Sequence, residues 1–488
     1  MFSSVQLTAR LPLQTSPYRT VATRLVIVAL TAGFLWAANH DDQRCIELVL
    51  LALLAPLMLA HRDSVAQIIA IRPVSRNCIA AFFALGAAAT LSAFSLRHAV
   101  YEWSILLLLA FTAALLAAEM TRAGAAGLRM LLRCLLIVGI LHAVRIGLIY
   151  AAALASGVQI DMHALAAGFS NARFFNHTLT PLLPLMVLLT LQAPLRSAWR
   201  WVSFALAAFW WAFMFVSEAR ASLLGLGAGL TIALVLRGSH ARDFAKLMAL
   251  SALAGAAIYV LAFILLPLAF GLVPVGVPSN VLARTVADPS SGRTLLWALA
   301  LQLIGAHPWL GVGPLHFAHE GHKLYIGAHP HDWLLQIGAE WGLPALLCLL
   351  GALASAARAL LHTGKRIADD DLHNQQILVA FLTACAAIMV DGVFSGVLVM
   401  PQSQLAIVLL AGCATGWVSS LDPTSASTSP SRPARYAVAL AVAVGLCGLA
   451  WSVAPDFLRH AKGEEATPAE KAINNKGNWP RLWEAGYF

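Results

Sequence analysis

Charged residues are scarce in this 488-residue sequence and make up 11% of it, whereas a soluble chain carries about a quarter. Hydrophobic residues make up 60%. They gather in blocks, many of which approach the roughly 20 residues that an α-helix needs to cross the hydrocarbon core of a bilayer. The scarcity of charge excludes an ordinary soluble multidomain protein, and the blocks predict an all-α, polytopic integral membrane protein.

Paired cysteines and a continuous basic stripe are also missing. The seven cysteines stand singly in apolar segments without a C-x-x-C motif, so neither a disulfide framework nor a zinc site is indicated. The formal net charge of +9 is dispersed over many short segments between the apolar blocks. This dispersal excludes a nucleic-acid partner, because such binding needs basic residues gathered on one surface.

The apolar blocks predict a bundle of twelve or thirteen membrane-spanning helices, of which the second and the last have the weakest pattern. In chain order they cover residues 22–39, 45–60, 78–95, 100–120, 129–154, 179–194, 199–217, 221–236, 247–272, 334–357, 376–397, 400–419 and 436–454. The predicted regions are N-terminal transmembrane helices (1–154), a first periplasmic loop (155–178), further transmembrane helices (179–272), a large periplasmic catalytic loop (273–333), transmembrane helices (334–419), a cytoplasmic linker (420–435), a last transmembrane helix (436–454) and a tail (455–488).

The distribution of basic residues predicts the orientation of the chain. With the N-terminus in the cytoplasm, the cytoplasmic segments hold 19 of the 32 lysines and arginines, and the short connections on the other side hold only Arg44, Arg97 and Arg220. This asymmetry is what the positive-inside rule demands. The two long segments, 155–178 and 273–333, are therefore expected in the periplasm.

These two segments have the composition of ordered, functional loops. Loops longer than about 12 to 15 residues are uncommon in compact structures unless they are functional or disordered. Both are rich in aromatic residues, which argues against disorder. Residues 291–305 in the second segment predict a helix that lies on the membrane rather than across it, with Ser290 or Ser291 as its cap.

Ionisable residues at the periplasmic boundary are the strongest candidates for function, because each must be paired, hydrated or used. They are Arg145 in the fifth span, Arg173 in the first long loop, Arg220 in the turn SEARAS, Arg293 at the start of the loop helix and His331 at the mouth of the tenth span. Arginine donates bidentate hydrogen bonds to phosphate oxygens, so the four arginines predict a diphosphate-binding site. A structural alternative stays open, in which Arg145 and Arg220 pair with carboxylates such as Glu218 or extend to the interface.

His331 is the candidate general base. An unperturbed imidazole pKa near 6.5 allows it to take a proton from a sugar hydroxyl. The neighbouring His316, His319 and His322 have a spacing of three that would align them on one helix side and invite a metal. Glycines interrupt that stretch, and no cysteine or carboxylate set accompanies the histidines, so no metal is predicted.

Four motifs between about residues 165 and 400 resemble the superfamily of O-antigen ligases, O-antigen polymerases and O-oligosaccharyltransferases. HPHDWLLQIGAEWGLPAL is similar to the signature in which an outside histidine precedes an amphipathic stretch and a Glu-x-Gly-Leu ending. SEARASLLGL resembles the Ser-x-x-Arg-x-x-Leu helix start. GRTLLWALALQLIGAHPWLGVGPLHF resembles the Arg-x-x-x-Trp loop helix with its Pro-x-x-Gly-x-Gly turn, and ARFFNHT resembles the Phe-x-Asn element of the first outside loop.

The resemblance implies a GT-C-like bundle and an inverting, metal-independent glycosyltransferase without a cofactor, acting at the periplasmic face of the bacterial inner membrane. The implied donor is a glycan on undecaprenyl diphosphate, held by Arg220 and Arg293 and assisted by Arg145 and Arg173. The implied acceptor is the lipid A core oligosaccharide, whose hydroxyl His331 activates. The protein most resembles an O-antigen ligase, because O-oligosaccharyltransferases commonly add a sizeable outside domain and the tail at 455–488 is short.

Three alternatives stay open. Two lie within the superfamily, namely an O-antigen polymerase and an O-oligosaccharyltransferase that glycosylates protein Ser or Thr. They stay open because a thirteenth span would depart from the twelve that ligases usually have. A secondary transporter also has about a dozen spans. Transporters tend to show inverted repeats and charges at the bilayer midplane, whereas the charges of this sequence map to one face beside long loops.

Overall fold

Helices form all the regular structure in the residues that the computed structural model describes, namely 20–60, 65–68, 71–169, 171–276, 292–322, 327–421 and 431–462. This confirms the predicted all-α fold. The elements are α1 (Val21–Leu35), α2 (His40–Ala60), α4 (Pro73–Ser92), α5 (Leu96–Ala155), α6 (Met162–Leu165), α7 (Ala172–Gln192), α8 (Ala198–Val216), α9 (Arg220–Arg237), the 3-10 turn η2 (Gly238–Ala241), α10 (Arg242–Tyr259), the π-helix η3 (Val260–Leu265), α11 (Leu266–Ala269), α13 (Arg293–Ala306), α14 (His316–His322), α15 (Trp333–Trp341), α16 (Leu343–Arg366), α17 (Leu372–Asp391), α18 (Pro401–Ser420) and α19 (Arg432–Ala461).

Nine helical stretches within these ranges are long and apolar enough to cross a membrane, which confirms the predicted polytopic membrane protein. Two of them are too long for one crossing. The 60 residues of α5 would extend about 90 Å, three times the hydrocarbon thickness, and the helix breaks at Gly124, where φ is 56°. The stretch Arg220–Ala269 also turns, at Gly238. Each stretch therefore covers two of the predicted spans.

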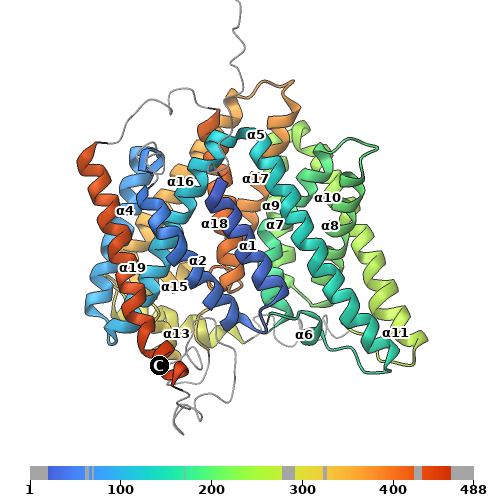
Figure 1. Ribbon diagram of the computed structural model, residues 1–488, viewed down its shortest axis with the longest axis horizontal. Helices are drawn as coiled ribbons and strands as arrows, with labels where there is room; N and C mark the ends of the chain where they lie inside the picture. Colours follow the sequence, from blue (N-terminus) through green and yellow to red (C-terminus); the bar gives the residue numbers. More distant parts are fainter. Residues whose placement is uncertain are drawn as a thin grey trace, which may run out of the picture.

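The α7 helix is the centre of the bundle (Figure 1). In its most apolar 18-residue window 89% of the residues are buried, against 22% for α16 and for α19, which lie at the periphery. Helices α8, α17 and α18 pack around α7. Side chains on the first turns of α7 are therefore enclosed by protein, whereas α16 and α19 present apolar residues to the lipid.

The structure corrects the boundaries of the tenth predicted span, 334–357. The helix breaks at Gly342, where φ is 86°, so that α15 ends at Trp341 and the span itself is α16. A Cβ at position 342 would lie 2.3 Å from the carbonyl oxygen of Trp309, so this crossing point requires glycine. Hydropathy cannot reveal the break, because the apolar pattern continues through it.

The segment 308–313 fills this break and caps the end of α15. Val312 N donates to the carbonyl of Ala339 at 2.9 Å, and Gly313 N donates to the carbonyl of Glu340 at 2.9 Å. The last carbonyls of a helix otherwise lack partners. The Pro-x-x-Gly-x-Gly turn that follows the loop helix therefore stabilises α15 and the position of the residues that precede it.

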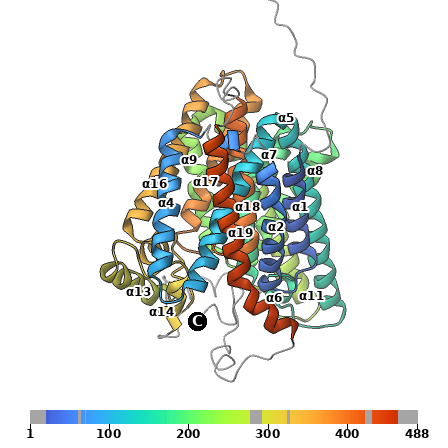
Figure 2. The ribbon, with the colours of Figure 1, turned by 60° about the vertical axis from the view of Figure 1, so that its left-hand side comes forward.

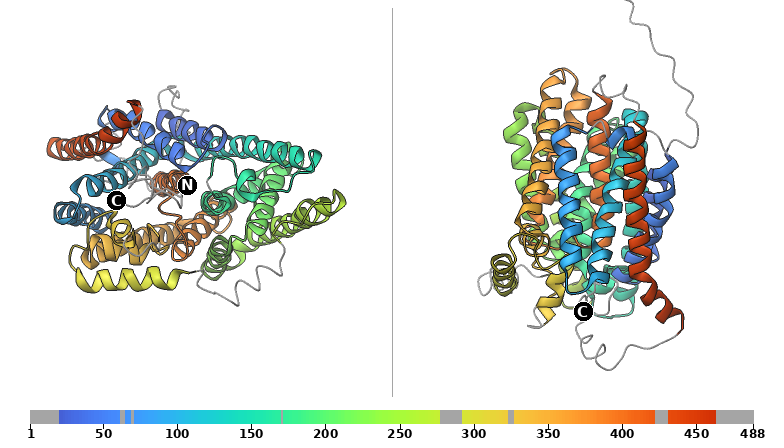
Figure 3. Two further views of the ribbon diagram at one scale, coloured as in Figure 1. Left: turned by 90° about the horizontal axis from the view of Figure 1, so that it is seen from below. Right: turned by 90° about the vertical axis from the view of Figure 1, so that its left-hand side faces the viewer.

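The two long segments lie at the same end of the bundle, where α6, α13 and α14 are found (Figures 1 and 2). As predicted for the loop helix, α13 runs across this end rather than along the bundle axis (Figure 3). Its Leu296 and Leu303 are buried, while Leu295 and Leu301 are exposed. The helix begins after Gly292, whose φ is 77°, and has no side-chain cap; the predicted cap residues, Ser290 and Ser291, lie outside the described residues.

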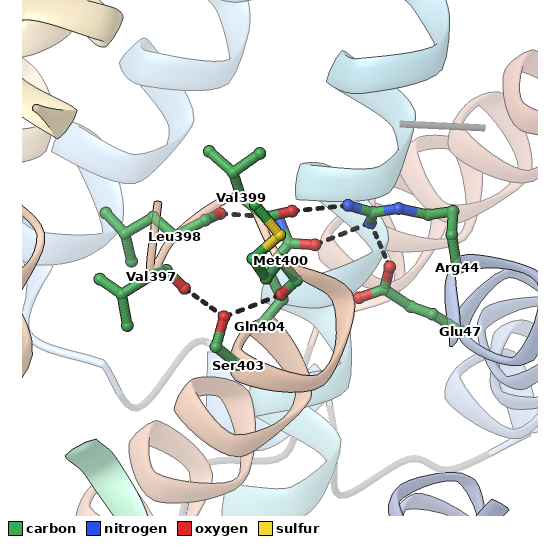
Figure 4. A network of polar contacts seen from close by, with 8 residues as sticks. All are labelled: Arg44, Glu47, Val397, Leu398, Val399, Met400, Ser403 and Gln404. Carbon is green, nitrogen blue, oxygen red and sulfur yellow. Dashed lines mark hydrogen bonds and ion pairs between the residues drawn. The ribbon is translucent and has the colours of Figure 1, made fainter. Parts of the chain in front are cut away.

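A buried polar network joins α2 to α18 (Figure 4). Arg44 lies within α2 and is 1% exposed; it forms an ion pair with Glu47 and donates to Gln404 Oε1 and to the carbonyl of Val399, both at 2.7 Å. Gln404 Nε2 in turn donates to the carbonyl of Leu398 at 2.8 Å. The network therefore fixes the non-helical segment 392–400 between α17 and α18.

We expect Arg44→Met to lower the free energy of unfolding by about 3 to 5 kcal/mol, because it leaves the buried carboxylate of Glu47 without its partner. The midpoint of thermal unfolding in detergent measures this loss. The exposed Arg24 of α1 provides the control, and Arg24→Met should leave the midpoint nearly unchanged. Adding Glu47→Leu to Arg44→Met should restore part of the loss, and a full loss in the double variant would contradict the ion-pair explanation.

Candidate active site

His331 stands immediately before α15, as the sequence predicts, in an uncommon backbone conformation. Its φ is 55°, in the left-handed region that non-glycine residues seldom occupy. The next residue, Asp332, caps α15 by accepting from Leu334 N at 2.8 Å and from Leu335 N at 3.1 Å. His331 N donates to His329 Nδ1 at 3.2 Å, and the two rings lie 4.0 Å apart. The cap and this contact hold the imidazole at the mouth of the helix.

The His331 imidazole is half-buried among basic groups. Burial lowers its pKa to about 3, and the positive charge of Arg293 is the next largest cause. His177 and Arg173 contribute in the same direction. Because the pKa lies far below neutral, the ring is uncharged at pH 7 and keeps a lone pair that can accept a proton.

The first turns of α7 bring Arg173 and His177 to this place. Asn171 caps the helix, accepting from Arg173 N at 2.9 Å. Arg173, His177 and Thr180 follow at spacings of four and three residues, so they share one face of α7. Arg173 is half-buried and His177 is 7% exposed, which matches a face that begins at the end of the bundle and continues into its interior.

Arg293 is the first residue of α13 and approaches His331 from the second long segment. Arg173 and Arg293 therefore act on one imidazole although 120 residues separate them in the chain. Two guanidinium groups beside a neutral histidine form a positively charged surface suited to an anion with several oxygens.

Arg220 is the first residue of α9 and follows the turn between α8 and α9, at the same end of the bundle. Glu218 in this turn has a φ of 56°, and Arg220 N donates to its carbonyl at 2.8 Å. Ser217 accepts from Asn176 Nδ2 of α7 at 2.6 Å, and Ser222 of α9 donates to Asp391 of α17. The turn before Arg220 and the start of α9 are thus hydrogen-bonded to α7 and to α17.

A pocket of about 370 Å³ opens beside Arg173. Its walls come from α6, the start of α7, the turn before α9 and the chain after α11. The lining residues are Met162, His163, Asn171, Ala172, Arg173, Val216, Ser217, Glu218, Val275 and Gly276. Charged and amide side chains form much of this wall, so the pocket suits a polar ligand with many hydrogen-bonding groups.

Arg145 has different surroundings from the other arginines. Its guanidinium donates to the carbonyl of Phe34 in α1 at 2.8 Å, and it lies near Gly168. Its neighbour His142 packs among the rings of Phe34, Phe169 and Phe175. These contacts tie α5 to α1 and to the first long segment through a backbone carbonyl, which is a different partner from the carboxylate considered in the sequence.

The histidines considered for a metal have protein partners. His316 Nε2 accepts from Ser95 N at 2.8 Å, and its Nδ1 bonds the carbonyl of Pro314 at 2.8 Å. His319 stacks on Phe94 with ring centroids 4.5 Å apart. The side chain of His322 lies outside the described residues. Within the described ranges, no three His, Cys, Asp or Glu side chains are close enough together to hold a metal ion.

Sequence reasoning missed His177 and Asp391. Asp391 is fully buried in α17 and accepts from Thr180 Oγ1 at 2.6 Å and from Ser222 Oγ at 3.0 Å. A carboxylate inside the apolar run AAIMVDGVF is itself a signal of function, because an ionisable residue in a span is costly. His177 gave no comparable signal, since one histidine on an apolar face usually belongs to the core.

Residues 202–350 match the family described as O-antigen ligase, which confirms the resemblance found in the motifs. The matched region contains Arg220, Arg293 and His331, whereas Arg145 and Arg173 precede it. No curated protein matches the chain.

Proposed function

We propose that this protein, whose residues 202–350 match the O-antigen ligase family, transfers O-antigen polysaccharide from undecaprenyl diphosphate to the lipid A core oligosaccharide. The match supports a function of the ligase or polymerase type, and the donor, the acceptor and the membrane face are our proposal. One observation carries it: His331, Arg293 and Arg173 come together at one end of a membrane bundle. A base next to an anion-binding surface is what glycosyl transfer from a lipid diphosphate requires.

The site faces the periplasm in this proposal. The chain path supports this orientation, because α7, α9 and α15 all begin, and α17 ends, at the end of the bundle that carries α6 and α13. The opposite end carries the connections α7–α8, η2 and α16–α17, to which the positive-inside rule assigns the cytoplasm. The multi-pass protein then lies in the bacterial inner membrane.

The donor enters sideways from the bilayer and its diphosphate binds Arg293 and Arg220, with Arg173 beside them. Guanidinium groups donate paired hydrogen bonds to phosphate oxygens and keep their charge at every physiological pH. Arg145 is a more distant candidate for this task, because its guanidinium is bonded to the carbonyl of Phe34. The glycan next to the diphosphate fits the polar pocket that Arg173 and Glu218 line.

His331 then takes the proton of the acceptor hydroxyl. The hydroxyl oxygen attacks the anomeric carbon opposite the diphosphate and forms the new glycosidic bond. The bond between that carbon and the diphosphate oxygen breaks, and its electron pair leaves with the diphosphate. Arginines stabilise the charge that develops there, as fixed donors do in other active sites. No metal or cofactor is needed for these steps, and the anomeric configuration is inverted.

Deletion of the gene tests the proposed reaction in cells. A ligase predicts lipopolysaccharide without any capped chains, because no other step joins the polymer to the core. A single-repeat ladder would instead indicate an O-antigen polymerase, and intact lipopolysaccharide with unglycosylated periplasmic proteins would indicate an O-oligosaccharyltransferase. Unchanged glycans in all three classes would contradict glycosyl transfer altogether and favour a transporter.

We expect His331→Ala to lower the transfer rate by about 10² to 10⁴ while the protein stays folded, because it removes a general base at a helix mouth. Arg220→Lys should also be severely impaired, because an ammonium group cannot donate a bidentate pair of hydrogen bonds. The exposed His307 at the end of α13 is the control, and His307→Ala should be active. Near-normal ligation by His331→Ala, with normal protein levels, would show that another group is the base.

The pH dependence of transfer should change when the donor binds. In the free protein the pKa of His331 is lowered to about 3, partly by Arg293 and Arg173. A bound diphosphate offsets their positive charge, favours the imidazolium and so raises this pKa towards its ordinary value near 6.5. The acid limb of kcat, which reports the donor-bound protein, is therefore expected at higher pH than that of kcat/KM for the donor. Coincident limbs would contradict this coupling.

A further inference from the structure

The carboxylate of Asp391 is only partly explained by its hydrogen bonds. Its Oδ2 accepts from Thr180 and Ser222, while its Oδ1 is buried and accepts no hydrogen bond from the described residues. A buried charge is expensive unless it is paired. The carboxylate therefore needs a positive or polarisable neighbour beyond the two hydroxyl groups.

The candidate for that neighbour is His177. It stands on α7, one turn before Thr180, and its Nδ1 is buried with no hydrogen bond to the described part of the chain. Asp391 accepts from Thr180 Oγ1 at 2.6 Å, one turn further along the same face of α7, so the carboxylate lies against the part of α7 that carries His177. His177 also contributes to the lowered pKa of His331. The face of α7 that carries His177 therefore adjoins both a buried carboxylate and the proposed base.

The backbone holds Asp391 and His331 in one rigid frame. Trp333 N donates to the carbonyl of Gly392 at 3.1 Å, and its indole Nε1 donates to the carbonyl of Met389 at 3.2 Å. Trp333 follows His331 by two residues, and the two carbonyls flank Asp391 in the chain. The end of α17 and the start of α15 therefore cannot move independently.

The other carboxylates near the base serve other groups. Asp332 caps α15, and Glu340 accepts from Phe317 N at 3.2 Å and from Gln336 Nε2 at 3.4 Å. Glu218 lines the same pocket as Arg173. Asp391 is thus the acidic group that approaches this face of α7 from α17, while α7 and α13 contribute Arg173 and Arg293.

We propose that His177 is a positioning residue for His331 and that Asp391 is its counter-charge, so that the pair stabilises the imidazolium formed when His331 takes the acceptor proton. The inference rests on the proposed function. A site that holds a diphosphate with arginines opposes any further positive charge, and the base must acquire one during transfer. The buried carboxylate offsets this opposition, and His177 conveys its effect while keeping the His331 ring in place.

The test uses full-length protein in liposomes with lipid-linked glycan as donor and lipid A core as acceptor. We expect His177→Gln and Asp391→Asn each to lower kcat at least tenfold and to change KM for the donor less than about twofold. Asp391→Asn removes a negative charge that favours the imidazolium, so the acid limb of its kcat profile should move to lower pH by about half a unit or more. A merely structural role would not move this limb.

The double variant and a control complete the test. If both residues act through His331, the double variant loses little more than the worse single variant, whereas independent losses multiply. His373→Gln is the matched control, because His373 lies in α17 like Asp391 but at the opposite end of the helix, and it should behave as wild type. Wild-type protein that transfers no glycan would refute the proposed function and this inference together. Active wild type with multiplying losses, or with variants whose pH limb is unchanged, would overturn this inference alone.

Discussion

A bilayer interior offers no water to a charge, so every ionised group must be paired inside the protein or placed at an end of the bundle. Arg44 is paired inside the protein, since Glu47, Gln404 and a backbone carbonyl surround its guanidinium. The arginines of the candidate site lie at an end of the bundle, where α7 and α13 begin. The same constraint therefore shapes both the packing of the bundle and the site, and it makes an unpaired charge informative wherever one is found.

In the proposed site, the arginines gathered at the membrane boundary disfavour protonation of the base, and the reaction needs a negative charge that offsets this effect. The positive field that suits a lipid diphosphate also opposes protonation of His331, which burial already disfavours. In the proposed reaction the donor's own negative charge removes much of this opposition, so the base becomes competent when the donor is present. In our proposal the buried carboxylate of Asp391 supplies the remaining negative charge from within the protein.

Much of the fold could be predicted from the sequence, because membrane spans are a property of local hydropathy. The positions of the apolar spans predicted that Arg173, Arg293 and His331 lie on one side of the membrane, and the family resemblance added the role of His331 as the base. The break at Gly342 depends on a carbonyl from Trp309, 33 residues earlier, and no local pattern encodes such a contact. His177 was overlooked for the same reason, since only the packing of α7 against α17 brings its helix face to Asp391.

Direct displacement at the anomeric carbon is the central claim, and the stereochemistry of the product tests it most directly. Purified protein would be supplied with lipid-linked glycan of known anomeric configuration and with lipid A core, and the new linkage would be assigned by NMR coupling constants. One attack opposite the leaving diphosphate predicts that the linkage has the opposite configuration to the donor. Retention of the donor's configuration would require a covalent glycosyl intermediate and would contradict the role assigned to His331.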